Sequence, residues 1–350
     1  MAEKDDRTVH GVNLSGWLVL ESWVTPSLFA STGAFDGAGL REALGRKRFS
    51  ELLDAHRSTF ITEEDFSRIA ARGFDAVRLP VPWFVLGDDG PFPGSYDGCL
   101  KYVDAAMNWA EDEGIQVLLC LSSIPGSTDS ESGHQMVIQN EERSRAAALE
   151  VISVLAERFG RRPGLLGIEP LDEPQVQHRH GLTLTDGVPM HRLRNYYRDA
   201  YETIRQMGGH KPVVVISDGG MPGEFRRFMA QDRYTNVWLD SHIYHYADST
   251  DASGPRGVRD LITATDRYLK TAHESHLPCM VGEWSAALPL ADSAMTPEGR
   301  IALERVYTSS QLSAFAGSAG WFFQTWKTES HLSSWDARVA LSSFERGMFD

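Results

Sequence analysis

Two glutamates stand close to the ends of strand-like apolar runs and offer the pair of carboxyl groups that cleavage of a glycosidic bond requires. Glu173 lies in "GIEPLDEP", residues 167–174, just after the run Leu165 to Leu171, and Glu283 lies in "VGEW", within the run Pro278 to Trp284. In glycoside hydrolysis one carboxyl group protonates the leaving oxygen, while the other attacks the sugar or activates water. Taken alone, either glutamate is more simply a solvated loop residue or a helix cap. The chemical interpretation therefore requires a fold that brings the two together.

The chain alternates strand-like and helix-like patterns from one end to the other. The eight apolar runs are Thr8 to Trp17, Ala76 to Trp83, Gln116 to Ser123, Leu165 to Leu171, Pro212 to Asp218, Val237 to Tyr244, Pro278 to Trp284 and Gly320 to Trp326. Several are continuously apolar, as parallel strands covered on both faces must be. Helical periodicity marks Leu100 to Glu113, Glu141 to Phe159, Met190 to Met207, Val258 to His276 and Ala302 to Ala316. Capping patterns at Thr62 and Thr296 begin two helices.

This alternation predicts an α/β fold, a closed (β/α)8 TIM barrel forming a single domain over residues 1–350. The segments 30–58 and 87–98 are expected to be insertions on the barrel rim. An open dinucleotide-binding sheet is disfavoured, because "GVNLSGWLVLESW" after the first run does not fit G-x-G-x-x-G.

A barrel places its catalytic residues where the strands end, at the carboxyl face. Glu173 and Glu283 then come from the fourth and seventh strands and face one opening. Arg78, in "FDAVRLP", lies inside an apolar segment, where a guanidinium needs a carboxylate partner. Glu283 suits that role. His242 and Tyr244 occupy the end of the sixth strand in the same way.

The bulk properties exclude several classes of function. The net charge of −14, with no clustering of Lys and Arg along the sequence, argues against a nucleic-acid partner. No run reaches the roughly 18 apolar residues of a membrane span. The first seven residues lack a secretory pattern, and the three cysteines are scattered, so we expect a cytoplasmic protein, although a chain whose leader had been removed would look the same. We expect no cofactor and no metal, because His242 and the carboxylates lack a recognised ligand spacing.

Seven motifs in order make the chain resemble glycoside hydrolase family 5, the retaining clan-A barrels, and most of all their exo-β-1,3-glucanase branch. The motifs are "GVNLSGWLVLESWVTPSLF" (11–29), "GFDAVRLPVPW" (73–83), "PGS" (125–127), "GIEPLDEP" (167–174), "LDSHIYHY" (239–246), "VGEWSAAL" (281–288) and "GWFFQTWKTE" (320–329).

The resemblance implies roles for the residues at the matching positions. Glu173 would be the general acid/base, and Glu283 the nucleophile that forms a glycosyl-enzyme intermediate. Arg78 and Tyr244 would hold Glu283 ionised, and His242 would contact the sugar near the acid/base. By the same resemblance, Glu21 and Trp23 would help to close a pocket on the non-reducing sugar.

Three positions depart from the family pattern, and all three would line the subsite of the sugar being cleaved. Asp172 stands where the family has an asparagine that contacts the sugar 2-hydroxyl, Ser122 where it has a histidine, and Gln324 where it has a stacking tryptophan. An added carboxylate raises the cost of ionising its neighbours, so Asp172 is either protonated or faces a cationic or donor-rich substrate. Gln324 offers amide hydrogen bonds in place of a stacking surface. These changes indicate an altered specificity.

Three functions are compatible with these residues. The first is a retaining β-glycosidase acting on a small glycoside or a glycosylated metabolite. The second is a repurposed pseudo-glycosidase of a biosynthetic pathway, in which the same glutamates perform elimination, ring formation or glycosyl transfer. The third, a binding protein without catalysis, is disfavoured because Glu173, Glu283, Arg78 and Tyr244 are all present. The sequence identifies neither the sugar, the aglycone nor the oligomeric state.

Overall fold

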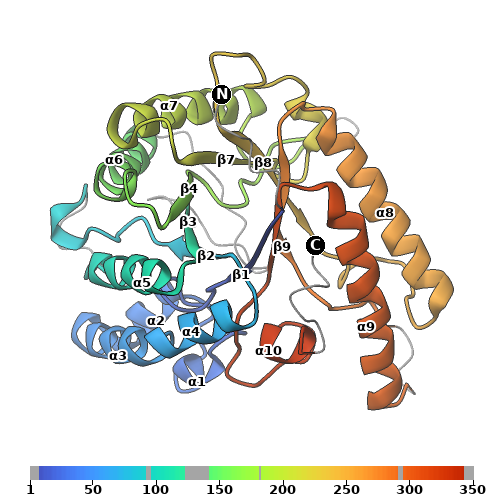
Figure 1. Ribbon diagram of the computed structural model, residues 1–350. Coiled ribbons are helices and arrows are strands. Elements are labelled where there is room, and N and C mark those ends of the chain that lie inside the picture. Colours follow the sequence, from blue (N-terminus) through green and yellow to red (C-terminus); the bar gives the residue numbers. More distant parts are fainter. Residues whose placement is uncertain (1–7, 92–95, 123–141, 181–182, 291–294, 343–350) are drawn as a thin grey trace.

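The computed structural model describes residues 8–91, 96–122, 142–180, 183–290 and 295–342. Eight parallel strands close into a barrel, which confirms the predicted (β/α)8 fold (Figure 1). In order around the barrel they are β1 (Val9–Asn13), β2 (Ala76–Val81), β3 (Gln116–Leu121), β4 (Leu165–Glu169), β7 (Val213–Ser217), β8 (Val237–Ile243), β9 (Cys279–Trp284) and β10 (Gly320–Phe323). β10 pairs with β1, so the first and last strands complete the ring.

Long helices surround the barrel close to the predicted positions (Figure 1). They are α4 (Glu63–Ala71), α5 (Leu100–Glu113), α6 (Glu142–Phe159), α7 (Met190–Gly208), α8 (Pro255–His273) and α9 (Pro297–Ala314). The predicted first residue of α6, at position 141, lies outside the described residues. Thr62 and Asp65 form a capping box at the start of α4, and the Thr296 side chain accepts from the backbone of Gly299 at the start of α9. Between β7 and β8 there is only a 3-10 helix, η2 (Pro222–Phe225).

The first of the two segments expected to be rim insertions is itself helical. Between β1 and α4 the chain forms α1 (Pro26–Phe29), α2 (Gly37–Leu44) and α3 (Arg46–Thr59), which share a small separate core. The second contains a short 3-10 helix, η1 (Gly87–Asp89), and its residues 92–95 lie outside the described chain. The remaining short elements are β5 (Arg179–His180), β6 (Thr183–Leu184), η3 (Phe315–Gly317) and α10 (Ala337–Ala340).

The inside of the barrel changes from apolar to polar along the strands. Residues two apart on a strand point to the same side, so Ala76 and Arg78 of β2 both face inward. Ala76 belongs to a buried apolar layer with Leu118 and Met280 of other strands. One step nearer the carboxyl ends, Arg78 and Cys120 form a buried polar layer. The apolar layer therefore forms the floor beneath the site.

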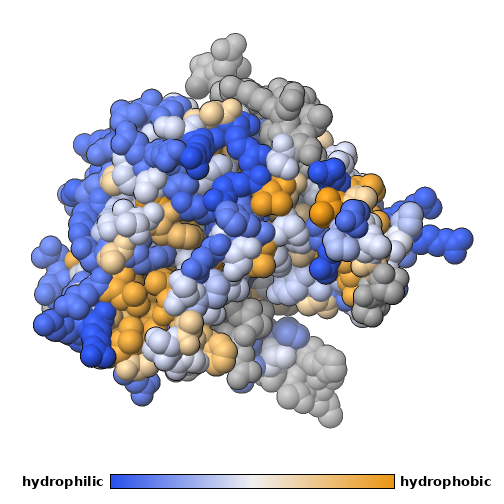
Figure 2. All heavy atoms as spheres, turned by 90° about the horizontal axis from the view of Figure 1, so that it is seen from below, coloured by the Kyte–Doolittle hydropathy of each residue, from blue (hydrophilic) through white to orange (hydrophobic). Residues whose placement is uncertain are grey.

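The outer surface seen from below the first view is mostly hydrophilic, and apolar residues gather in a few patches (Figure 2). Among the described residues, no helix combines the length and the apolar character needed to cross a bilayer.

Candidate active site

Arg78 of β2 lies at the centre of the site, with a side chain that is completely buried. Its guanidinium donates to three acidic side chains, from Nε to Glu169 at 2.9 Å, from Nη1 to Glu283 at 2.7 Å and from Nη2 to Asp172 at 2.6 Å. Burial alone would lower the pKa of Arg78, but the surrounding carboxylates, Asp172 foremost, raise it well above its ordinary value. Arg78 is therefore a permanent cation, and it offsets the charges around it. The sequence predicted only its contact with Glu283.

Asp172 thus has a cationic partner within the protein. Its side chain is almost completely buried, and Arg78 bridges it to Glu283. This contact offsets the like-charge repulsion expected between the two acids. The first interpretation of Asp172, as a group that needs a proton or a cationic substrate, did not include this partner.

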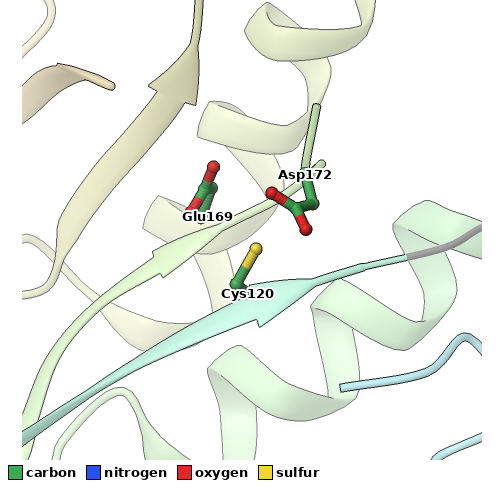
Figure 3. Close-up of side chains that lie close together, drawn as sticks. All are labelled: Cys120, Glu169 and Asp172. Atoms are coloured by element: carbon green, nitrogen blue, oxygen red, sulfur yellow. The ribbon is translucent and has the colours of Figure 1, made fainter. Parts of the chain in front are cut away.

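Figure 3 shows Cys120, Glu169 and Asp172 with their side chains pointing toward one another from the ends of β3 and β4. These residue types are possible metal ligands. However, Arg78 already contacts all three, since its Nη2 also lies 3.1 Å from the Cys120 sulfur. Burial raises the pKa of Cys120 well above its ordinary value, so its sulfur is a thiol. The guanidinium takes the place of a metal in this cluster, and the residues present do not fit an ion there.

Glu283 is held through both of its oxygens. Oε1 accepts from Arg78, and Oε2 accepts from the Tyr244 hydroxyl at 2.8 Å. Burial raises the pKa of Tyr244 well above its ordinary value, and the charge of Glu283 adds to this effect, so the phenol remains a donor. A carboxylate with two fixed donors is held in one orientation.

Glu173 and Glu283 both approach the same nitrogen of one imidazole. Nδ1 of His242 is 2.6 Å from Glu173 Oε1 and 3.6 Å from Glu283 Oε2. Those two oxygens are therefore separated by at most the sum of these distances, about 6 Å. Carboxyl groups of retaining glycosidases are ~5–5.5 Å apart, whereas inverting enzymes separate them by ~6.5–9.5 Å. An upper limit of about 6 Å between the two oxygens fits the shorter separation found in retaining enzymes.

The backbone at Glu173 has a φ of +33°, which a residue with a side chain rarely adopts. Strained backbone of this kind persists where the surrounding structure fixes it, and it is concentrated at functional sites. The Glu173 side chain is 23% exposed, so it reaches the opening, while Glu283 lies deeper at 5%.

His242 is held in the cationic form by the acids that surround it. Burial lowers its pKa, but the charges of Glu283 and Asp240 outweigh this effect and raise the pKa well above its ordinary value. Nε2 of His242 lies 3.2 Å from Asp240, whose other oxygen accepts from the backbone N–H of Gly282 at 2.6 Å. Asp240 thus fixes the ring that touches Glu173.

Ser122 and Gln324, the other two departures from the family pattern, are buried and bonded to the protein. The Ser122 hydroxyl donates to the backbone carbonyl of Val81 at 3.3 Å. The Gln324 Oε1 accepts from the Ser15 hydroxyl at 2.8 Å, while its Nε2 group has no hydrogen-bond partner among the residues that the structure describes. Gln324 therefore has a donor to offer to a bound molecule.

Glu21 and Trp23 lie outside the network centred on Arg78. Glu21 is buried and its Oε1 accepts from the backbone N–H of Gly16 at 3.2 Å. The Trp23 ring packs against Trp335 at 5.2 Å between ring centroids, and Trp335 packs against Tyr244 at 5.5 Å. Trp23 is thus connected to the site through a second tryptophan that the sequence analysis did not identify.

A cavity of about 550 Å³ opens beside Glu173. His242 and Tyr244 line it together with Ser217, the last residue of β7, and the loop from Asp218 to Met221 that follows. Glu21, Trp23 and Gln324 do not line this cavity. The cavity therefore extends from the acid/base candidate toward the ends of β4, β7 and β8.

Several members of the network were missed in the sequence. Asn13, at the end of β1, accepts from Arg78 at 3.1 Å, and Glu169 and Asp240 occupy buried inward positions on their strands. A signal was present for the two acids, because each stands alone within an apolar run, as Arg78 does. Trp335 carried no such signal. The "PGS" motif at 125–127 lies outside the described residues.

Comparison with known proteins places the chain in a family. The model of "Cellulase (glycosyl hydrolase family 5)" matches residues 47–300. The "Probable glucan 1,3-beta-glucosidase A" of Aspergillus clavatus is 30% identical over 374 residues, covering 96% of this chain and 86% of the relative. The "Glucan 1,3-beta-glucosidase" of Schwanniomyces occidentalis is 28% identical with the same coverage. The chain belongs to glycosyl hydrolase family 5, and the prediction that it is an enzyme of the glycoside hydrolase type is confirmed.

Solved structures share the fold. The rutinosidase from Aspergillus niger aligns with a TM-score of 0.79 at 21% identity, covering 98% of both chains. The endoglucanase Cel5A from Thermotoga maritima aligns with a TM-score of 0.59 at 17% identity, covering 97% of this chain and 95% of that one. Identities this low support the barrel architecture alone.

Proposed function

We propose that the protein is a retaining β-glycosidase with Glu173 as acid/base and Glu283 as nucleophile. The observation that carries the proposal is the shared contact of both glutamates with His242 Nδ1, which keeps the nearer carboxylate oxygens within about 6 Å. That separation leaves no room for the water that an inverting mechanism places between the general base and the sugar.

The reaction has two steps. In the first, the Glu283 carboxylate attacks the anomeric carbon, the glycosidic C–O bond breaks, and the Glu173 carboxyl group gives its proton to the leaving oxygen. In the second, the Glu173 carboxylate takes a proton from water, the water oxygen attacks the same carbon, and Glu283 is released. Arg78 and Tyr244 orient Glu283 for the attack. His242 stabilises Glu173 after it has lost its proton.

We propose a small glycoside or a glycosylated metabolite as the substrate. The cavity of about 550 Å³ is within the range of small-molecule sites, ~300–1,000 Å³. An aromatic platform is replaced by Gln324, whose free Nε2 group suits a hydrogen-bond acceptor on the substrate. All three cysteines are buried free thiols, as in reducing compartments, which supports action in the cytoplasm.

One observation favours the second candidate, a pseudo-glycosidase of a biosynthetic pathway. Each of the three altered residues is bonded to the protein, Asp172 to Arg78, Ser122 to a backbone carbonyl and Gln324 to Ser15. Fewer groups then remain to bind the hydroxyls of an ordinary sugar. The same glutamates would catalyse elimination, ring closure or glycosyl transfer.

The test is turnover of a panel of aryl β-glycosides by the wild type, Glu283→Gln and Glu173→Ala. Glu283→Gln is expected to abolish turnover. Glu173→Ala should lose about 10²–10⁴-fold in rate with a poor leaving group, and added azide should restore turnover of an activated one by forming the β-glycosyl azide. Glu150→Gln, an exposed surface change, is the matched control and should behave as wild type.

Asp172→Asn tests the altered subsite in the same assay. An asparagine oxygen can still accept from Arg78, and its amide can donate to a sugar hydroxyl, so kcat/KM for an aryl β-glucoside should rise about tenfold or more. If wild type and Asp172→Asn both leave every simple glycoside intact while remaining folded, the hydrolase proposal is wrong and the second candidate stands.

A further inference from the structure

Five arginines meet on the outer wall of the barrel, away from Arg78 and the two glutamates. Arg194 and Arg198 come from the first half of α7, and Arg226, Arg227 and Arg233 come from the segment between η2 and β8. They line a hollow of about 410 Å³. Only two of the five are adjacent in sequence, so the absence of a basic cluster inferred from the sequence is wrong for this wall. The fold concentrates positive charge here in a chain whose net charge is −14.

Only some of these charges are balanced by carboxylates. Arg194 contacts the Glu224 carboxylate at 3.2 Å, and Arg226 pairs with Glu274. Arg198, Arg227 and Arg233 have no carboxylate partner among the residues that the structure describes. Charge that a protein gathers and leaves unbalanced attracts an anion.

Two of the five guanidinium groups stack on the ring of Phe228. Phe228 is buried and packs against Phe225 at 5.8 Å between ring centroids. Arg198 lies over the Phe228 ring at 5.0 Å, and Arg194 lies over it at 5.8 Å. This stacking orients both guanidinium groups before any ligand arrives.

The backbone of the same segment is bent around the hollow. Arg227 and Met229 have φ values of +55° and +52°, in the left-handed region that side chains disfavour. Two such residues on either side of the buried Phe228 cost conformational energy, which the surrounding packing must offset. The bends place Arg226 and Arg227 on the rim of a second hollow that Lys270, His273 and His276 also line.

We propose that this hollow, defined by Arg194, Arg198, Arg226, Arg227 and Arg233, is a binding site for a small dianionic oxyanion, a phosphate or sulfate group that is either free or carried as an ester. Arginine presents a planar fork of N–H donors that matches the oxygens of such groups and can bind two of them at once. The long-range field of an acidic protein repels anions, so binding must come from these local contacts. The site is separate from the glycosidase chemistry.

Titration calorimetry with inorganic phosphate, at constant ionic strength balanced with chloride, tests the proposal. Wild type should bind phosphate saturably. Arg198→Gln/Arg227→Gln removes two guanidinium groups without carboxylate partners and should raise the Kd at least about tenfold, because a hydrogen bond to a charged group contributes that much or more. The double change Arg256→Gln/Arg259→Gln, on exposed positions near the start of α8, removes the same charge elsewhere and should leave the Kd unchanged.

Further measurements identify the source of the anion and check that the variants are folded. Phenyl phosphate binding more tightly than inorganic phosphate would identify an ester group as the ligand, weaker binding would identify the free ion, and sulfate binding would extend the class. Arg198→Lys/Arg227→Lys keeps both charges but loses the forks and should also weaken binding. Circular dichroism without phosphate checks that each variant is folded. Equal Kd values in wild type and Arg198→Gln/Arg227→Gln, or no saturable binding by wild type, would overturn the proposal.

Discussion

Glu169 differs from the other carboxylates around Arg78 because burial controls its charge. One of its oxygens accepts from Arg78, but the other, Oε1, is buried with no hydrogen-bond partner among the described residues. Burial raises the pKa of Glu169 to about 8, against the opposing effect of Arg78. At neutral pH the folded protein therefore favours a neutral Glu169.

This pKa makes stability depend on pH in a definite direction. Between pH 4.5, the ordinary value, and about 8, the unfolded chain carries a carboxylate where the folded chain carries an acid. The unfolded state then binds fewer protons, so the contribution of Glu169 to stability falls as pH rises, by up to about 1.4 kcal/mol per unit. Glu169→Gln should remove this slope, measured as the free energy of unfolding in guanidinium at several pH values.

The same variant separates a neutral Glu169 from an ionised one. A glutamine can still accept from Arg78 Nε and resembles the protonated acid, so the stability below pH 4.5 should change little. At pH 7 the variant should be the more stable protein, by up to about 3 kcal/mol, because only wild type loses stability as its unfolded chain ionises. If Glu169 were an ionised partner of Arg78, the change would instead cost about 3–5 kcal/mol, as the loss of one member of a buried ion pair does. Such a loss would contradict the assignment.

The proximity of Glu173 and Glu283 was predictable at the residue scale, while the shared use of Arg78 was not. Glu173 follows one strand-like run and Glu283 lies near the end of another, and barrel geometry alone brings these strand ends to one face. The contact between Arg78 and Asp172 depends on the direction of individual side chains around a closed ring. No spacing along the chain encodes that direction. The basic wall was hidden for the same reason, since its arginines come from separate segments.

At the scale of elements, the packing of β8 against β9 holds the histidine beneath the acid/base candidate. The position of Gly282 is essential there, because a Cβ atom built on it would lie 2.0 Å from Asp240 Oδ2. The Asp240 carboxylate fills this space, accepts from the Gly282 N–H and reaches His242. The packing of these two neighbouring strands thus fixes the position of His242 in the site.

Gly282→Ala should therefore lower both stability and activity. Displacing the Asp240 carboxylate from a filled core is expected to cost about 1–3 kcal/mol, and the accompanying shift of His242 should reduce kcat. Gly317→Ala is the control, since no heavy atom lies within 4 Å of the position that the added methyl group would occupy and the φ of Gly317 is not left-handed. Thermal unfolding and turnover of an aryl glycoside provide the two measurements, and wild-type values in Gly282→Ala would contradict this role for the contact.

The strands were predictable as elements because their apolar runs are short and continuous, and the predicted helix α5 has the bounds that the structure gives it. The helices α2 and α3 were not predicted. Their apolar residues pack into a small core that is separate from the main cluster around the barrel. The end of α8 was placed three residues too late, because Leu277 continues the apolar pattern after the helix has ended at His273.

At the scale of the whole molecule, one buried cluster extends around the ring. Val12 of β1, Leu119 of β3, Ile168 of β4 and Phe323 of β10 all belong to it. Because this cluster joins strands from both ends of the chain, the barrel is expected to unfold as one unit. Far-ultraviolet and near-ultraviolet circular dichroism should then report the same midpoint in guanidinium. Two separated midpoints would contradict the single domain predicted for residues 1–350.

Among the described residues, the five side-chain partners of Arg78 are supplied by both ends of the chain and by the middle. Asn13 belongs to the first strand, and Glu283 to the next to last. During refolding, neither half of the chain can therefore complete the contacts of Arg78 before the other half has folded onto it. The recovery of turnover would report closed barrels and not compact intermediates. The rate at which activity returns therefore measures the last step of folding.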